Sequence, residues 1–117
     1  EYVDDILFCD KSKHTAEYMT LCYNVKPEWV DKIPAVVNRY DNTCRPQIVK
    51  KETNEWLHTL LSKYKEATGM PVLLNTSFNE HCSPIINEPL QAWHALRDKL
   101  IDVLVLEDYI IYYGYHK

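Results

Sequence analysis

The segment 53–68 and the short apolar run after it constrain the fold more than any other part of the sequence. Apolar side chains recur at helical spacing along this segment: Trp56, Leu57, Leu60, Leu61 and Tyr64. Gly69 and Pro71 then form a helix stop signal. The run 72–74 is entirely apolar, as in a strand that is buried on both faces. A helix followed directly by a buried strand predicts a layered domain with both helices and a sheet.

The rest of the chain continues this alternation. A second helix is expected after Asn87, which can cap it, with Pro89 in the first turn. We expect the apolar stripe of this helix to consist of Leu90, Trp93, Leu96 and Leu100. One helical turn is expected at 27–33, and strands are expected at 19–25, 35–37, 47–49, 102–106 and 109–113, with a turn at 107–108. The order predicts an α/β or α+β layered domain.

Composition excludes several classes of protein. The chain has 13 Lys and Arg against 17 Asp and Glu, a net charge of -4, whereas a general nucleic-acid binder needs a basic surface. No apolar run reaches the roughly 18 residues that a membrane span needs. Only two glycines occur, which excludes a glycine-rich phosphate loop. We therefore expect neither a nucleic-acid partner nor a membrane partner.

Length and cysteine usage limit the number of domains and the cellular compartment that we expect for this chain. The 117 residues are expected to form one domain or a piece of one. The chain begins with Glu1 and shows no signal-peptide pattern, so we expect a processed start or part of a longer chain. The four cysteines permit two disulfides but form no CxxC pair, and a structural zinc site is not expected. Without a secretory signal, we expect reduced thiols and a cytoplasmic location.

The polar string 75–79 concentrates the groups that a ligand site needs. It offers four side chains with amides or hydroxyls: Asn75, Thr76, Ser77 and Asn79. The string directly follows the predicted strand 72–74, and ligands of α/β sheets commonly bind beyond the carboxyl ends of strands. The alternative is an ordinary strand-to-loop turn, because Asn and Ser favour turns, and composition alone favours this alternative.

A second candidate is Arg45, in the polar loop 41–47. Its guanidinium is a fork of donors that suits phosphate or carboxylate, although a single arginine in a loop is more often simply solvated. The neighbouring Cys44 is better explained as a buried, inert side chain than as a reactive thiol, because no base is evident beside it. The acidic residues of the segment 4–10 lack the spacing and the glycine of a calcium loop.

Five blocks of the chain carry a family resemblance: 33–37, 41–47, 69–79, 83–86 and 102–105. The block 69–79 reads Gly-Met-Pro-Val-Leu-Leu-Asn-Thr-Ser-Phe-Asn and is the most specific of them. Over roughly residues 17–115, the chain resembles the O-carbamoyltransferases of the nodulation and antibiotic-tailoring type. Two of these blocks, 41–47 and 69–79, follow each other in the family's order on either side of the predicted helix 53–68, and this makes a chance match improbable.

The resemblance implies an enzyme with an actin-like amino-terminal domain and a YrdC-like carboxyl-terminal domain, a mixed sheet with flanking helices. Residues 17–117 would be part of the YrdC-like domain, and residues 1–16 would be an extension or a remnant of the preceding segment. The family implies that ATP, with Mg, and carbamoyl phosphate form a carbamoyl-adenylate, from which the carbamoyl group moves to a hydroxyl acceptor. The implied partners are a small-molecule substrate, the actin-like domain of the same protein and, in a homodimer, a second copy.

The resemblance also implies roles for individual residues. Arg45 would contact the phosphate or carbamoyl end of the ligand. Ser77 and Asn79 match a Ser-x-Asn pattern that resembles the YrdC nucleotide site, and Asn75 and Thr76 would shape its wall. Arg45 and Ser77 are therefore the expected catalytic residues, and no metal ligand is expected on the chain.

The chain departs from the family pattern at a few positions. Glycines are expected where Asn42 and Cys82 stand, a carboxylate where Ser83 stands, and a histidine near Asn38. Asn42 is a mild change, because Asn tolerates glycine-like backbone angles. These departures leave open a non-catalytic nucleotide-binding or interaction module, and also a structural domain whose tyrosine-rich end docks on a partner. We expect the isolated chain to fold without turning over.

Overall fold

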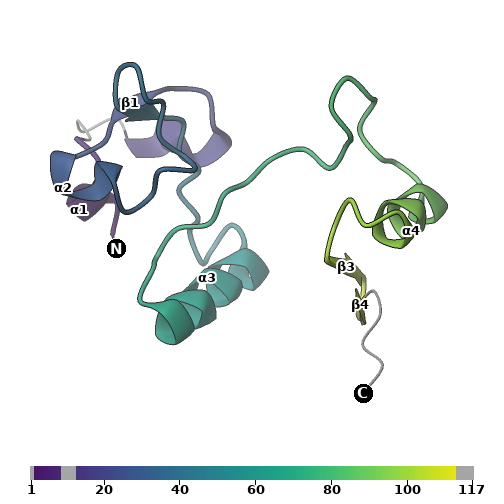
Figure 1. Cartoon of the computed structure of the whole chain (residues 1–117). Helices are drawn as coiled ribbons and strands as arrows, with labels where there is room; N and C mark the ends of the chain where they lie inside the picture. Colours follow the sequence, from purple (N-terminus) through teal and green to yellow (C-terminus); the bar gives the residue numbers. More distant parts are fainter. Residues whose placement is uncertain (1, 9–12, 113–117) are drawn as a thin grey trace. The chain divides into compact units, whose positions relative to one another are not determined.

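A computed structural model describes residues 2–8 and 13–112 (Figure 1). The chain divides into two compact units, residues 1–74 and 75–117, and each is described by itself. The first unit contains α1 (Val3–Ile6), the 3-10 helix η1 (Lys13–Tyr18), β1 (Tyr23–Asn24), α2 (Pro27–Val30), β2 (Thr43–Cys44) and α3 (Glu55–Thr68). The second unit contains α4 (Pro89–Arg97), β3 (Val103–Leu106) and β4 (Tyr109–Tyr112).

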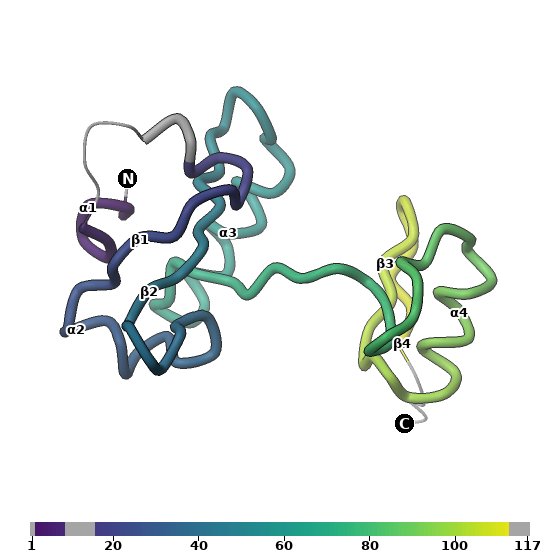
Figure 2. The backbone as a smooth tube through the Cα atoms, turned by 90° about the horizontal axis from the view of Figure 1, so that it is seen from above, coloured from purple at the N-terminus to yellow at the C-terminus, as the bar shows by residue number. Residues whose placement is uncertain are grey.

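The expected mixture of helices and strands is confirmed, and the strands form two separate antiparallel pairs. In the first unit β1 pairs with β2, with Tyr23 opposite Cys44. In the second unit β3 and β4 form a hairpin in which Leu104 lies opposite Ile111, with α4 beside it (Figure 2). The predicted strands 102–106 and 109–113 are thus confirmed, with residue 113 outside the described residues. The tight turn between them requires a positive φ of 49° at Glu107.

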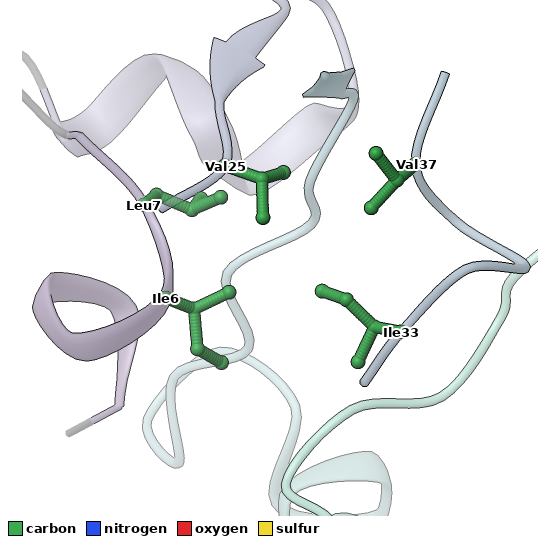
Figure 3. Packing of buried hydrophobic residues seen from close by; sticks show 5 residues of the cluster. All are labelled: Ile6, Leu7, Val25, Ile33 and Val37. Atoms are coloured by element: carbon green, nitrogen blue, oxygen red, sulfur yellow. The ribbon is translucent and has the colours of Figure 1, made fainter. Parts of the chain in front are cut away.

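Five buried side chains form the core of the first unit: Ile6, Leu7, Val25, Ile33 and Val37 (Figure 3). Ile6 ends α1 and Leu7 follows it, Val25 follows β1, and Ile33 and Val37 lie in the turn region after α2. An isolated bridge joins Leu7 to Val25. Burying each such side chain stabilises the fold by about 1.5–3 kcal/mol. The segment before residue 17 thus contributes to this core, and the predicted domain boundary between residues 16 and 17 stays a prediction.

The predicted helix 53–68 is confirmed as α3. The side chain of Asn54 caps it by accepting a hydrogen bond of 3.0 Å from the Leu57 N–H. Gly69 ends it in the left-handed conformation, with φ of 77°. Only part of the expected apolar face is covered, since Leu57 is half-buried whereas Trp56 is 68% exposed. Lys65 attaches the inner side of the helix to Tyr2 through a hydrogen bond and a cation–π contact.

The second predicted helix is confirmed as α4, but its expected cap and stripe are largely wrong. The capping position is Glu88, not Asn87, and no side chain caps the helix. The buried face consists of Ala92, Ala95 and Leu96, whereas the other three stripe residues are exposed: Leu90, Trp93 and Leu100. The small alanines allow the hairpin to approach this face closely, and Leu104 packs against it. Of the expected stripe, only Leu96 is buried.

Three short predicted strands are wrong. Residues 35–37 form a turn, and 47–49 and 72–74 pair with no strand among the described residues. Leu74 is 61% exposed, so the run 72–74 is not buried on both faces, although Val72 packs against the first core. The strand expected at 19–25 is reduced to β1, while the helical turn expected at 27–33 is confirmed as α2. A short apolar run becomes a strand only where a partner satisfies its backbone.

No helix in the described ranges 2–8 and 13–112 is both long enough and apolar enough to cross a membrane.

Candidate functional site

The polar string 75–79 opens the second unit, and the side chain of Asn79 organises the loop that follows. Its Oδ1 accepts a hydrogen bond from the Ser77 hydroxyl. Its Nδ2 donates to the carbonyl oxygens of Glu80, at 2.8 Å, and Ser83, at 3.1 Å. Because both ends of the amide are used inside the loop, Asn79 acts here as a residue that holds the loop in shape.

Backbone hydrogen bonds close the same loop. The Ser83 N–H donates to the Glu80 carbonyl at 3.0 Å, and the Ile86 N–H donates to the Phe78 carbonyl at 2.9 Å. Ile86 in turn packs against the buried cluster of the second unit. The string is therefore fixed at its carboxyl end to the core that α4 and the hairpin build.

The string presents exposed polar side chains. Asn75, Thr76 and Ser77 are all exposed. An amide oxygen can only accept, so the single hydroxyl proton of Ser77 is directed to Asn79. Ser77 therefore offers its lone pairs, and in this geometry it suits a donor group of a ligand, such as an amide or a hydroxyl, better than a bare anion.

Arg45 lies in the first unit, directly after β2. Its guanidinium is exposed and makes no hydrogen bond or ion pair to any other residue in the described part of the chain. The preceding Cys44 packs against the first core, in agreement with the expected structural role of this cysteine. The three described cysteines, Cys22, Cys44 and Cys82, form no disulfide. A fixed strand thus positions a fork of five N–H donors that is available for an anion.

The turn before Arg45 is held by short polar side chains. Asp41 Oδ1 accepts from the backbone N–H of Thr43 at 3.0 Å and from its hydroxyl at 2.8 Å. Asn38 Oδ1 accepts from the Tyr40 N–H at 3.0 Å. Sequence reasoning gave neither Asn38 nor Asp41 a structural role, although Asx turns of this kind are the signal that could have identified it. Asn38, where the family pattern has histidine, serves to shape the turn.

Both expected glycine positions adopt the left-handed backbone conformation. The φ angle is 56° at Asn42 and 65° at Cys82. Asn is the non-glycine residue that adopts this region most readily, so the expected mild effect of Asn42 agrees with the structure. Cys82 has no such preference, and it keeps the glycine-like turn at a local cost in free energy. The backbone of both turns is thus retained without glycine.

The structure joins some of the predicted site residues directly. Ser77 and Asn79 are hydrogen-bonded to each other, and Asn75 and Thr76 precede them in the same string. Arg45 belongs to the other unit. The pairing of Arg45 with the string 75–79, and the ligand contacts of all five residues, therefore stay predictions.

A shallow cavity of about 350 Å³ in the first unit provides no further candidate. Its lining combines the cations of Lys50 and Lys51 with the carboxylates of Asp4 and Glu52, and it includes none of the predicted site residues. Lys50 is already hydrogen-bonded to Glu17, which raises the pKa of Lys50. Mixed charge and existing partners give this cavity no preference for an anionic ligand.

The candidate site has no resident metal ligands. In residues 2–8 and 13–112, no group of three His, Cys, Asp or Glu side chains is placed to hold a metal ion.

Residues 1–112 match a family model described as "Carbamoyltransferase C-terminus". Two similar curated proteins are from Methanocaldococcus jannaschii. The uncharacterized protein MJ1058 is 36% identical over 90% of this chain and 17% of its own length, and the uncharacterized protein MJ1051 is 32% identical over 95% and 21%. The nodulation protein U of Rhizobium tropici is 42% identical over 55% of this chain and 11% of its own length. The chain thus spans about a fifth or less of the length of these relatives.

Asn79→Asp tests the loop-holding role of this amide. The variant keeps the oxygen that accepts from Ser77 but loses both N–H donors to the carbonyls of Glu80 and Ser83. We expect the second unit to lose about 1–2 kcal/mol of stability, with faster amide exchange at Ser83 and Ile86, measured by urea unfolding and hydrogen exchange. The control is Asn87→Asp, since Asn87 is exposed and, among the described residues, only its backbone N–H is hydrogen-bonded, to Gln91 Oε1. Equal exchange in the two variants would contradict the role.

Substitutions at Cys82 test the left-handed turn. Cys82→Gly relieves backbone strain at the cost of a more flexible unfolded chain, and we expect a net gain of about 0.5 kcal/mol. Cys82→Val should lower stability by about 1 kcal/mol, because β-branched residues adopt positive φ least readily. Urea unfolding of the second unit measures both variants. Asn42→Gly serves as the comparison and should change stability by only a few tenths of a kcal/mol. Equally stable Gly and Val variants at position 82 would exclude strain there.

Proposed function

Because this chain belongs to the carbamoyltransferase C-terminus family, we propose that it forms part of an O-carbamoyltransferase that makes carbamoyl-adenylate from ATP and carbamoyl phosphate. The proposal includes a hydroxyl acceptor, an actin-like amino-terminal domain in the same polypeptide, a YrdC-like fold for this region and a cytoplasmic location. Its main support in the structure is Arg45, whose exposed guanidinium has no partner within the described residues and whose backbone follows a turn that Asp41 orders.

The proposed chemistry is a transfer in two stages. Carbamoyl phosphate first loses its phosphate to water, and an oxygen of the resulting carbamate attacks the α-phosphorus of ATP. The bond between the α- and β-phosphates breaks, so that pyrophosphate leaves as carbamoyl-adenylate forms. The acceptor oxygen then attacks the carbamoyl carbon, the bond to the adenylate breaks, AMP leaves, and the hydroxyl proton passes to solvent.

The residues of this chain would contribute binding and charge stabilisation. Arg45 would neutralise phosphate charge that develops as the phosphoanhydride bond breaks. Ser77, whose proton is directed to Asn79, would accept a hydrogen bond from the carbamoyl NH₂ or from a ribose hydroxyl. Asn75 and Thr76 would line the same wall, and Asn79 would hold the loop. Mg²⁺ bound to ATP would screen the phosphates, and no step is assigned to residues of this chain as metal ligands.

The second candidate function is a nucleotide-binding or interaction module of the same family without turnover. It is favoured by Ser83, which stands where the family pattern has a carboxylate and contributes its backbone groups to the loop. Binding of ATP without pyrophosphate release would identify this second function.

The product balance tests the proposed reaction. We expect the full-length protein that carries this region to release pyrophosphate from ATP only when carbamoyl phosphate is present, and to do so without an acceptor. A coupled pyrophosphate assay, with inorganic phosphate instead of carbamoyl phosphate as the control, measures this dependence. Absence of carbamoyl-phosphate-dependent pyrophosphate release would refute the proposed reaction.

Arg45→Ala tests the anion contact. Loss of a charged hydrogen bond should weaken binding of ATP or carbamoyl-adenylate by roughly 1–3 kcal/mol, measured by calorimetry with the full-length protein. Arg45→Lys should recover only part of the loss, because an ammonium cannot replace the bidentate fork. The matched control is Arg39→Ala, since Arg39 is also exposed and also unpaired among the described residues. Equal affinities in the Arg45 and Arg39 variants would exclude the contact.

A further inference from the structure

The strand pair of β1 and β2 has one apolar face and one polar face. Tyr23 and Cys44 are directly paired (Figure 2), and both pack against the core of the first unit. Because neighbouring residues of a strand point to opposite faces, the next pair, Asn24 with Thr43, lies on the other face. Arg45 stands two residues after Thr43 and is exposed, so it continues this second face, here called the polar face.

The side chain of Asp41 also reaches the polar face. Its Oδ1 accepts from the Thr43 hydroxyl at 2.8 Å, as well as from the Thr43 N–H. Its other oxygen, Oδ2, makes no hydrogen bond to any residue within 2–8 and 13–112, and the residue is exposed. Arg45 likewise has no partner within these ranges, so the carboxylate and the guanidinium do not neutralise each other. Both groups are therefore available to a ligand.

Hydrogen-bond acceptors and donors are separated along the polar face. Thr43 offers a ligand only its lone pairs, because its single hydroxyl proton is donated to Asp41. The Oδ2 atom of Asp41 can also only accept, whereas Arg45 supplies five N–H donors and no acceptor. Thr43 and Arg45 are two residues apart on an extended chain, a separation of roughly 7 Å. The polar face thus suits a ligand with hydrogen-bond donors at one end and an anionic group at the other.

The phosphate compounds of the proposed reaction match this arrangement to different degrees. Pyrophosphate offers phosphate oxygens to Arg45 but no adequate donor to Asp41 and Thr43. Carbamoyl phosphate has an amide donor, but the amide lies directly beside the phosphate. In a nucleotide the ribose separates two neighbouring hydroxyls from the phosphates, and a carboxylate that accepts from a ribose hydroxyl is a common element of nucleotide sites. A nucleotide is therefore the compound whose donors and charge are distributed like the polar face.

We propose that the polar face binds the ribose and a phosphate of a nucleotide, with Asp41 Oδ2 and Thr43 Oγ1 accepting from the ribose hydroxyls and Arg45 donating to the phosphate. The inference rests on the proposed function, because it takes ATP as the nucleotide. It gives Asp41 and Thr43 a ligand contact in addition to their part in the turn, and it assigns Arg45 to the nucleotide and not to the carbamoyl group. Neither contact requires carbamoyl phosphate or turnover.

Calorimetry with the full-length protein that carries this region tests the ribose contacts. The probes are ATP, dideoxy-ATP, which lacks both ribose hydroxyls, and tripolyphosphate, which lacks the nucleoside. The binding of interest is the one that Arg45→Ala weakens, which separates this site from any other nucleotide site of the protein. We expect the wild-type protein to bind ATP at least about tenfold more tightly than dideoxy-ATP, because a hydroxyl that donates to a carboxylate makes a charged hydrogen bond.

Asp41→Asn separates the ligand contact from the turn. The amide keeps an oxygen that accepts from Thr43 but replaces Oδ2 by a donor, so the turn is retained while the ribose loses its acceptor. We expect the preference for ATP over dideoxy-ATP to fall below about threefold. The affinity for tripolyphosphate should stay unchanged or rise, because a negative charge near the anion is removed.

Two further variants support the comparison. Thr43→Val keeps the β-branched shape and the backbone N–H but removes the hydroxyl, and it should also reduce the preference for ATP over dideoxy-ATP. The matched control is Asp31→Asn, since Asp31 is exposed, belongs to the same unit and has no side-chain partner among the described residues. We expect this control to keep the wild-type preference.

Three results would overturn the inference. In the first, the wild-type protein binds ATP no more tightly than dideoxy-ATP. In the second, Asp41→Asn weakens tripolyphosphate as much as ATP, which would leave Asp41 with a role in the turn alone. In the third, Asp41→Asn weakens carbamoyl phosphate and keeps the ribose preference, which would assign the polar face to the carbamoyl amide.

The outcome is distinguishable from that of the proposed reaction. A selective loss of the ribose preference in Asp41→Asn and Thr43→Val would support the inference even without pyrophosphate release. Carbamoyl-phosphate-dependent pyrophosphate release with an unchanged ribose preference in both variants would refute the inference and leave the proposed reaction standing.

Discussion

Backbone N–H and C=O groups need hydrogen-bond partners wherever strands are short, and in this chain Asn and Asp side chains supply many of them. Asn79 bonds to two carbonyl oxygens of its own loop, Asp41 holds the turn before Arg45, and Asn54 caps α3. Both blocks of the candidate site are therefore fixed by local side chains, and neither requires a long strand. Some polar residues therefore hold the loops in shape, such as Asp41 and Asn79, whereas others are exposed, such as Arg45 and Thr76.

The two left-handed turns show how the family pattern survives loss of glycine. The φ angles at Asn42 and Cys82 are those that glycine adopts freely, and hydrogen bonds on either side keep each turn closed. A backbone conformation can thus be retained at a strained residue when the surrounding loop determines it. For the proposed reaction, this means that substitution of glycine at these positions does not by itself remove the site.

Exposed apolar surface is the second general feature of the molecule. Trp56 on α3, Trp93 on α4 and Ile110 on β4 all remain exposed although their sequence patterns are those of covered surfaces. The relatives that match this region are several times longer, and most of their length lies outside it. The periodicity of the sequence thus predicts more buried surface than each of the two units buries by itself.

The sequence by itself determined the features that depend on near neighbours: helix α3 with its stop at Gly69, the existence of α4, the hairpin and its turn, and the two polar blocks that carry the family resemblance. Their signals are local, since caps, periodicity and turn residues act within a few positions. Only the tertiary structure decided that 35–37, 47–49 and 72–74 are not strands, and that α4 buries its alanines while Trp93 stays exposed. Those outcomes depend on which distant segment comes close enough to pair or pack, and a short apolar run has the same composition whether or not such a partner is present.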